Sequence, residues 1–215
     1  KILMKLGTKD QGLMKICENN TKFSFTKKID QKNTVSALKS LKKEISLSKE
    51  IKFVESYDIS HHSGSAAIGG CVVFSEKGKL KEKYKLFNIS KKNSGDDISS
   101  MVEVIERRFK AEDLDLQKPD LIILDGGKTH LSYVLKKLKE LGLDTIPVIA
   151  ISKGIRRKAE MDLVHTRDSD SQIKRGSLAY KFIQEIRDET HRFSISKQKR
   201  KQRKLSAGSL LDNLK

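Results

Sequence analysis

The pattern of hydrophobic and polar positions changes near residue 50. Before it, apolar residues recur at helical spacing among lysines, which predicts helices over residues 9–28 and 32–47. After it, short runs rich in β-branched residues are bounded by glycine and polar residues, as is typical of strands. We therefore expect a helical lead-in over residues 1–50, followed by a sheet-based domain over residues 51–195.

The first strands are predicted to form an antiparallel meander. Residues 51–59 and 66–74 are two largely apolar segments, and the sequence EKG at 76–78 is a tight-turn signal after them. Residues 79–88 then alternate lysines with apolar residues, which predicts a third strand with one face in water.

Helices and strands alternate in the part that follows. Apolar residues at 3.6-residue spacing predict one helix after Gly95 and a second one after Gly127. The runs DLIILD (120–125) and TIPVIAIS (145–152) flank the second helix and are almost wholly apolar, as expected for buried parallel strands. This strand–helix–strand order implies a right-handed crossover.

The remainder of the chain is more polar. Residues 153–176 are predicted to form a basic loop with a short strand near Met161–His165. A last helix starts near Ser177 and runs into a basic tail, residues 196–215. The predicted fold class is therefore α/β, with a mixed sheet made of a three-strand antiparallel meander plus parallel strands and flanked by helices.

Charge and composition narrow the function. The 215 residues include 45 Lys and Arg against 28 Asp and Glu, a net charge of +17. Such a charge attracts polyanions, so nucleic acid is the expected partner, although a merely solvated lysine-rich surface would have the same composition. No apolar run is long enough to cross a membrane, and the first residues lack a signal-peptide core. The sequence has only two cysteines, Cys17 and Cys71, far apart, so neither a disulfide framework nor a cysteine-based zinc site is expected. We expect a soluble, cytoplasmic monomer.

Two acids end otherwise apolar strands. Asp58 lies in YDISH and Asp125 in ILDGGK, and an acid at such a position is costly unless it is solvated, paired or bound to a metal. Both are expected at the carboxyl ends of strands, where open α/β sheets place their sites. If the two strands are neighbours, the carboxylates converge on a site that suits Mg²⁺ or Mn²⁺ and could act on a phosphodiester. Taken singly, either acid is better explained by a cap or a salt bridge.

Basic residues near these strand ends are candidates for phosphate binding. The glycines of DGGK open a helix whose N-terminal N–H groups favour an anion, although a glycine turn alone is a weak signal. Candidate DNA-binding residues lie in this turn, in the following basic loop, in the last helix and in the tail: Lys128, Lys153, Arg156, Arg157, Arg187, Arg192, Lys197, Lys199, Arg200 and Lys201. No aromatic residues are interleaved in the loop and tail clusters, so base stacking is not predicted there, and a solvated charge run is the alternative.

Periodicity alone points His191 away from the sheet. A helical wheel places it about 150° from the stripe formed by Leu178, Phe182 and Ile186. On spacing alone, His191 is therefore expected to be a solvated histidine at the end of the last helix.

Six motifs occur together in the order YDISHHSG, CVVF, SGDDISSM, PDLIILDGGKTHL, ISKGIRRKAE and IRDETHRFSI. In this order and spacing they resemble the C-terminal half of the UvrC family of excinucleases. The resemblance covers residues 51–195 well, and residues 1–50 and the tail more loosely. It implies an RNase H-like endonuclease that makes the 5′ incision at a lesion in double-stranded DNA during nucleotide excision repair. It also implies UvrB as a partner, UvrA upstream, and a tail (196–215) that begins a linker to a helix-hairpin-helix region.

The resemblance also assigns site residues. It makes Asp58 and Asp125 ligands of Mg²⁺ or Mn²⁺, and it places His191 where related nucleases have a carboxylate, against the wheel. His191 then completes the metal shell or moves a proton. Asp97 of the GDD motif matches another acid implicated in the family's activity. The sequence departs from the family pattern beside these motifs, at His62, Ser63, Thr129 and His130.

Two alternatives stay open. One is a catalytically silent DNA-binding module that uses the RNase H fold, against which the presence of Asp58, Asp125 and His191 argues. The other is a different RNase H-like nuclease, such as one resembling endonuclease V, and the GDD and RDETHRF motifs favour UvrC over it.

If the tail contacts phosphates, affinity for DNA should be steeply salt-dependent. Neutralising two tail lysines that touch phosphates should lower the slope of log K against log salt by about 1.8, at ~0.9 per contact. Anisotropy titrations at several salt concentrations measure this slope, and an unchanged slope would identify the tail as a solvated charge run.

Overall fold

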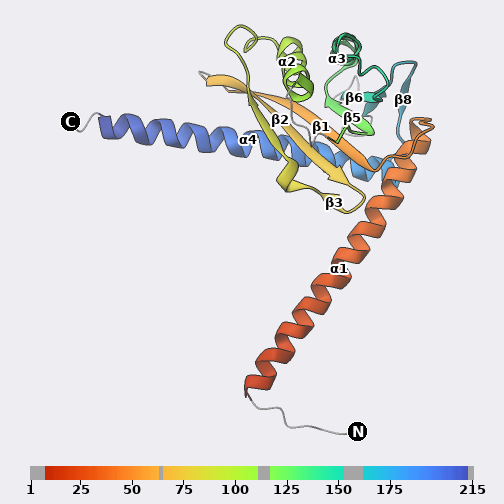
Figure 1. Cartoon of the computed structure of the whole chain (residues 1–215), viewed down its shortest axis with the longest axis vertical. Coiled ribbons are helices and arrows are strands. Elements are labelled where there is room, and N and C mark those ends of the chain that lie inside the picture. Colours follow the sequence, from red (N-terminus) through yellow and green to blue (C-terminus); the bar gives the residue numbers. More distant parts are fainter. Residues whose placement is uncertain (1–7, 63–64, 111–116, 153–161, 213–215) are drawn as a thin grey trace.

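The computed structural model of the chain describes residues 8–62, 65–110, 117–152 and 162–212 (Figure 1). An eight-stranded sheet is covered by α-helices on both faces. In chain order the elements are α1 (Thr8–Glu44), β1 (Phe53–His62), β2 (Ser65–Ser75), β3 (Gly78–Lys79), a 3-10 turn (Lys81–Lys83), β4 (Lys85–Asn88), α2 (Asp97–Lys110), β5 (Leu121–Asp125), α3 (Lys128–Glu140), β6 (Val148–Ser152), β7 (Leu163–His165), β8 (Asp170–Gln172) and α4 (Leu178–Asp212). Much of α1 extends away from the sheet, whereas α4 runs across it.

The sheet is mixed, as predicted. Its order is β3-β2-β1-β5-β6-β7-β8, with β4 also paired to β2. The β1, β2 and β4 pairings are antiparallel, and β1, β5 and β6 run parallel in the middle of the sheet. The predicted combination of a meander with parallel strands is therefore confirmed. β7 and β8 add an antiparallel edge, of which the polar strand β8 was not predicted.

Two predicted elements differ from the structure. The two expected helices are one continuous helix, α1, because the polar residues Asp30 and Asn33 are tolerated there and no proline or glycine interrupts the chain between them. The expected strand over 79–88 is broken into β3 and β4 by the turn at Lys81–Lys83. The predicted division into lead-in, domain and tail stays a prediction, although α4 continues without a break through the beginning of the tail.

Strand alternation assigns the two faces of the sheet to different helices. On one face, Val54 and Ile123 belong to a buried cluster with Ile186 of α4 and with residues of α1. On the other face, Tyr57 and Leu124 belong to a cluster with residues of α2 and α3. Residues two positions apart on a strand therefore face the same helix layer. Among the helices that the structure describes, none combines the length and apolar character needed to cross a membrane.

Two consecutive glycines of β2 allow a helix to approach each face closely. A Cβ atom at Gly69 would lie 2.3 Å from Cγ2 of Val104 in α2. A Cβ atom at Gly70 would lie 2.2 Å from Oγ of Ser194 in α4. The absence of side chains at these two positions therefore sets how closely α2 and α4 pack on the sheet.

Gly70→Ala should lower the free energy of unfolding by about 1–3 kcal/mol, the usual cost of overpacking, because the added methyl group meets Ser194. Chemical denaturation of the variant measures this. Gly95→Ala is the control, since an added Cβ there meets no atom within 4 Å, and it should change stability by no more than about 0.5 kcal/mol. Equal stability of the two variants would contradict the close contact between β2 and α4.

Candidate active site

The register of two parallel strands brings Asp58 and Asp125 together. Tyr57 of β1 lies opposite Leu124 of β5, so the next residue of each strand is also side by side, at the interstrand spacing of about 5 Å. Both acids follow the alternation that faces α4, and on that face Thr190 Oγ1 donates a hydrogen bond to Ser56 Oγ at 3.0 Å. The two carboxylates thus share one face where the parallel pairing of the two strands ends. The predicted strand-end position is right for Asp125, the last residue of β5, but wrong for Asp58, because β1 continues to His62 through its antiparallel pairing with β2.

Asp58 is the more buried of the two acids. Its side chain is 9% exposed, against 29% for Asp125. Burial raises the pKa of the Asp58 carboxyl, the charge of Asp125 raises it further, and His191 with hydrogen bonds from Ser60 and Ser194 only partly offsets this. An acid that resists ionisation in this way gains from any cation placed beside it.

His191 lies beside Asp58 although it is largely exposed. Its Nδ1 is 3.6 Å from Oδ2 of Asp58, and 62% of its side chain is exposed. The helical wheel wrongly predicted that His191 points away from the sheet. It counted Leu178 in the inward stripe, but Leu178 is 44% exposed, whereas Thr190 and Ser194 are buried. The inward face of α4 is thus rotated toward His191, which stands at its flank and at the edge of the site.

Arg187 connects the acidic site to a carboxylate that the sequence did not single out. Its Nη2 donates to Asp125 Oδ1 at 3.1 Å, and its Nη1 donates to Asp162 Oδ2 at 2.8 Å. Gln184 Nε2 also donates to Asp162. Arg187, predicted as a DNA contact, is 12% exposed and bound to these acids, so the structure places it inside the site. The only sequence signal for Asp162 was its position within the short strand predicted near Met161–His165.

The imidazole of His130 lies against the glycine turn that follows Asp125. Gly127 N donates to His130 Nδ1 at 3.4 Å, and the same ring lies 2.7 Å from the position of a Cβ at Gly126. Lys128 is exposed and lies 3.4 Å from an oxygen of Asp170. Asp170 also contacts His165 Nδ1 at 2.9 Å, and His165 Nε2 contacts the end of β6 at 2.8 Å. This chain of contacts links α3, β8, β7 and β6 beside the acidic site.

Asp97 begins α2, in the helix layer on the other face of the sheet from α4. The preceding loop is fixed near the carboxyl end of β1, because Ser94 Oγ accepts from Ala67 N at 3.0 Å and the next residue along, Ile68, pairs with Ser60. Asp97 is therefore at the same end of the sheet as Asp58 but on the other side of it, and its role stays a prediction.

The donor set at Asp58 and Asp125 fits a hard divalent cation. Two carboxylates on one face are the protein ligands that Mg²⁺ commonly uses, with water and substrate oxygens completing the shell. Within the described ranges, no group of three or more His, Cys, Asp or Glu side chains forms a ready metal shell. The fit therefore rests on two carboxylates, one of which now pairs with a guanidinium, and the predicted ligand role of His191 stays a prediction.

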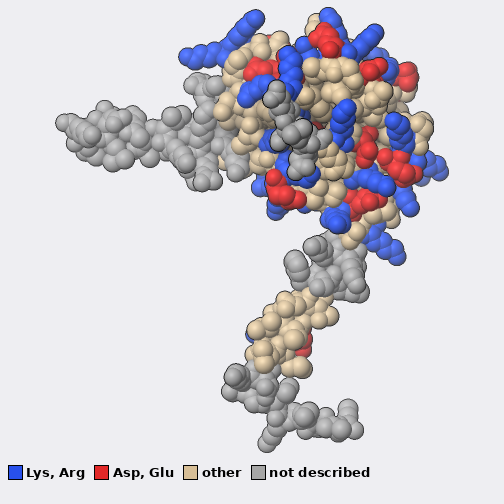
Figure 2. Space-filling view, viewed as in Figure 1, with Lys and Arg blue, Asp and Glu red and all other residues tan. Residues whose placement is uncertain are grey.

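The predicted DNA-binding residues are only partly placed. Lys153, Arg156 and Arg157 lie outside the described residues, as do the side chains of Lys197, Lys199, Arg200 and Lys201. Arg192 is 59% exposed and donates to Glu189 at 2.7 Å. Figure 2 shows Lys and Arg spread over the visible face of the globular part, with Asp and Glu among them.

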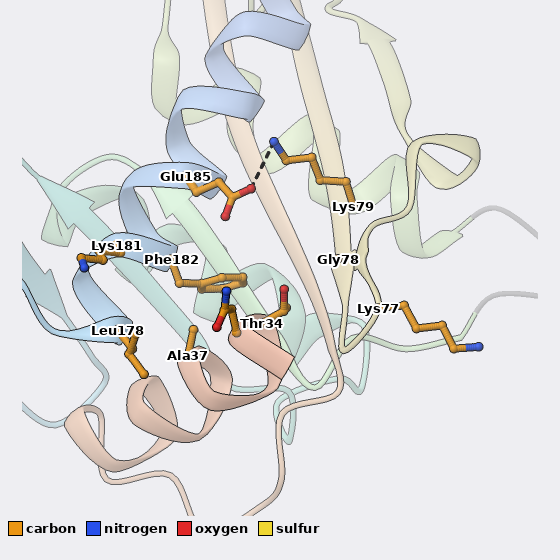
Figure 3. A pocket seen from close by; sticks show the side chains of 10 residues that line it. Thr34, Ala37, Lys77, Gly78, Lys79, Leu178, Lys181, Phe182 and Glu185 are labelled. Carbon is orange, nitrogen blue, oxygen red and sulfur yellow. Dashed lines mark ion pairs between the residues drawn. The ribbon is translucent and has the colours of Figure 1, made fainter. Parts of the chain in front are cut away.

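A hollow of about 680 Å³ lies away from these acids, between the end of α1, the turn before β3 and the start of α4 (Figure 3). Phe182 and Leu178 line it, and Lys79 at its rim pairs with Glu185 at 3.2 Å. Phe182 precedes His191 by nine residues, about 14 Å along a helix. None of the predicted site residues lines this hollow, so it is separate from the acidic site.

Comparison with known proteins identifies relatives of the chain. The family model described as the UvrC RNase H endonuclease domain matches residues 42–195. UvrABC system protein C of Legionella pneumophila (strain Paris) is 35% identical over 205 residues, which are 94% of this chain and 33% of the relative. The same protein of Hydrogenovibrio crunogenus is 33% identical over 95% of this chain and 34% of the relative. The chain thus spans about a third of the length of these relatives.

Among solved structures, similarity is more distant. Endonuclease V of Bacillus subtilis is 16% identical, with a TM-score of 0.40 over 70% of this chain and 84% of that chain. Endonuclease V of Ciona intestinalis, in complex with DNA that contains inosine, is 20% identical, with a TM-score of 0.36 over 62% of this chain and 58% of that chain.

Asp58→Asn should stabilise the metal-free protein. The raised pKa means that the folded state binds the proton more tightly than the unfolded state, so stability falls as pH rises from the ordinary value toward the folded pKa. The variant should lose this pH dependence and gain about 1 kcal/mol at neutral pH, or about 2–4 °C in Tm.

Scanning calorimetry without divalent cations measures this effect. Asp168→Asn, at an exposed position, is the control and should change stability by less than about 0.5 kcal/mol. A destabilised Asp58→Asn variant would show that the folded protein stabilises this carboxylate rather than straining it.

Proposed function

Since the chain belongs to the UvrC RNase H endonuclease domain family, we propose that it hydrolyses a DNA phosphodiester in a metal-dependent reaction and makes the 5′ incision of nucleotide excision repair. The observation that carries this proposal is the pair of carboxylates, Asp58 and Asp125, side by side where the parallel pairing of β1 with β5 ends, with His191 at their edge. The His191 imidazole is largely exposed, so this edge of the site is open to solvent.

Each residue has a role in the proposed reaction. Asp58 and Asp125 would hold Mg²⁺ or Mn²⁺, which would polarise the phosphodiester and help to ionise the attacking water. The oxygen of that water forms a bond to phosphorus, and the bond from phosphorus to the 3′ oxygen breaks. The products are a 5′-phosphate and a 3′-hydroxyl.

His191 is well placed to move a proton in this step. It is exposed, so a substrate can reach it, and its Nδ1 lies 3.6 Å from Oδ2 of Asp58, next to the proposed metal ligand. As a general acid it would protonate the departing 3′ oxygen, and general acid–base groups typically contribute about 10²–10⁴-fold to a rate. The same position also leaves His191 within reach of the cation as a further ligand.

The proposed substrate is damaged double-stranded DNA, presented with the help of UvrB after UvrA. The net charge of +17 favours binding to the phosphate backbone without sequence preference. In this proposal, partners rather than base contacts select the cleavage position, which agrees with the absence of aromatic residues in the basic clusters of the sequence.

Asp58→Asn and Asp125→Asn should each abolish the 5′ incision. They should leave intact the second incision, on the 3′ side of the lesion, which the resemblance to UvrC assigns to another domain of the full-length protein. Both changes remove a charge that the proposed reaction needs, but they also reduce repulsion of phosphates, so DNA affinity should persist. The measurement is incision of a lesion-bearing duplex by the full-length protein with its partners, analysed at both cut positions. His191→Ala should lower the 5′ rate by about 10²-fold or more.

Asp120→Asn is the matched control. Asp120 directly precedes β5, at the end opposite Asp125, and accepts from the backbone N atoms of Lys52 and Phe53 at 2.9 Å. The Asp120→Asn variant should therefore make both incisions at the wild-type rate. Normal 5′ incision by the Asp58 and Asp125 variants would point instead to a catalytically silent DNA-binding module, and loss of both incisions would indicate misfolding.

A further inference from the structure

We propose that Arg187 is the built-in counter-ion of Asp125, and that Asp162 is the positioning residue that retains the Arg187 guanidinium when a divalent cation binds. This inference rests on the proposed function in one respect, that Asp125 is a metal ligand. Neither Arg187 nor Asp162 is then a ligand. Their role is to control how much positive charge lies on Asp125.

The geometry shows one guanidinium divided between two acids. Arg187 comes from α4, Asp125 from the end of β5, and Asp162 from the residue just before β7. The two terminal nitrogens of Arg187 go to different carboxylates, at 3.1 Å for Asp125 and 2.8 Å for Asp162. Arginine suits this position because it stays charged and presents its donors in a fixed planar fork.

The need for a counter-ion follows from the register of the strands. Asp58 and Asp125 are adjacent and face the same side, so two like charges meet in a partly buried place. Without a divalent cation, the guanidinium is the nearest full positive charge that bonds to either acid among the described contacts. Arg187 therefore offsets the repulsion between the two acids and orients the Asp125 carboxylate before a cation arrives.

The two contacts of Arg187 are not equivalent. The Asp162 side chain is 7% exposed and is also held by Gln184, whereas the Asp125 side chain is 29% exposed. The bond to Asp162 is shorter and more buried, so it is the one that persists. The bond to Asp125 is longer and closer to solvent, so it is the one that an incoming cation weakens by repulsion.

The guanidinium also has spare hydrogen-bonding capacity. Arg187 Nε is buried and has no hydrogen-bond partner among the residues that the structure describes. The described side chains therefore hold the guanidinium through its two terminal nitrogens alone, one on each acid.

Asp162→Asn should weaken the binding of Mn²⁺ at Asp125 by about tenfold or more, the usual range for loss of a residue that supports a metal ligand. Without the charge of Asp162, the guanidinium transfers fully to Asp125 and competes with the cation. Isothermal titration calorimetry with Mn²⁺ and no DNA measures the affinity directly. Asp170→Asn is the matched control, because it removes one acid from the same region but has no bond to Arg187.

The double variant Asp162→Asn/Arg187→Gln separates this role from a purely structural one. Removing the guanidinium as well frees Asp125, so Mn²⁺ affinity should return to at least the wild-type value. A purely structural role predicts that the double variant binds more weakly than Asp162→Asn alone. If Asp162→Asn does not fold, the double variant, which lacks both charges of the buried pair, carries the test by its affinity relative to the wild type.

The outcomes distinguish this inference from the proposed function. If Asp125→Asn binds Mn²⁺ as well as the wild type does, the metal site itself is wrong, and the proposed function fails with it. A second outcome is that Asp125→Asn loses Mn²⁺ binding, while Asp162→Asn binds Mn²⁺ as tightly as the wild type or as tightly as the Asp170→Asn control. The metal site then stands, and the proposed role of Asp162 is overturned.

Discussion

The rest of the site depends on the parallel pairing of β1 with β5, which fixes two acids side by side on one face of a buried sheet. Like charges at that spacing repel, and burial of Asp58 adds to the cost. The surroundings reduce this cost in several ways. Hydroxyl groups bond to Asp58, an imidazole lies beside it, and Arg187 shares its charge with Asp125. The site is thus a strained arrangement that its surroundings partly relieve.

The opposite face of β1 carries a buried ion pair of a different kind. Glu55 is 1% exposed and bonds to both Arg108 of α2 and Tyr57. This ion pair is closed to solvent and lies within the α2 and α3 layer. Breaking such a pair by removing one partner typically costs about 3–5 kcal/mol. The acidic site differs from this closed pair because the partner beside Asp58, His191, is 62% exposed and therefore open to solvent.

Much of the fold could be predicted from the sequence because the apolar pattern of each strand is strong. The parallel strands and the meander follow from runs such as IILD and CVVF, and the strand-end position of Asp125 follows with them. The end of β1 was placed too early, so Asp58 lies within the strand and not at its end. The break between β3 and β4 was missed because lysines alternate with apolar residues across it as they would in one strand.

The remainder of the site depends on tertiary placement. The Arg187–Asp162 bond joins residues 25 positions apart, and nothing local to either residue indicates it. The orientation of α4 was misjudged because two of its buried residues, Thr190 and Ser194, are polar and do not count in a hydrophobic wheel. The motif resemblance placed His191 near Asp58 where periodicity did not, because a motif carries tertiary information that spacing lacks.

The paired glycines of β2 also limit how this sequence can diverge. At Gly70 the strand presents bare backbone to α4, and Ser194 fills the space that a side chain would need. A methyl group at position 70 would be accommodated more easily if position 194 lost its hydroxyl, because Cβ of residue 194 would lie at 3.3 Å, and the same reciprocity links Gly69 with the methyl groups of Val104. A change on β2 is therefore best tolerated together with a smaller residue on the helix that covers it.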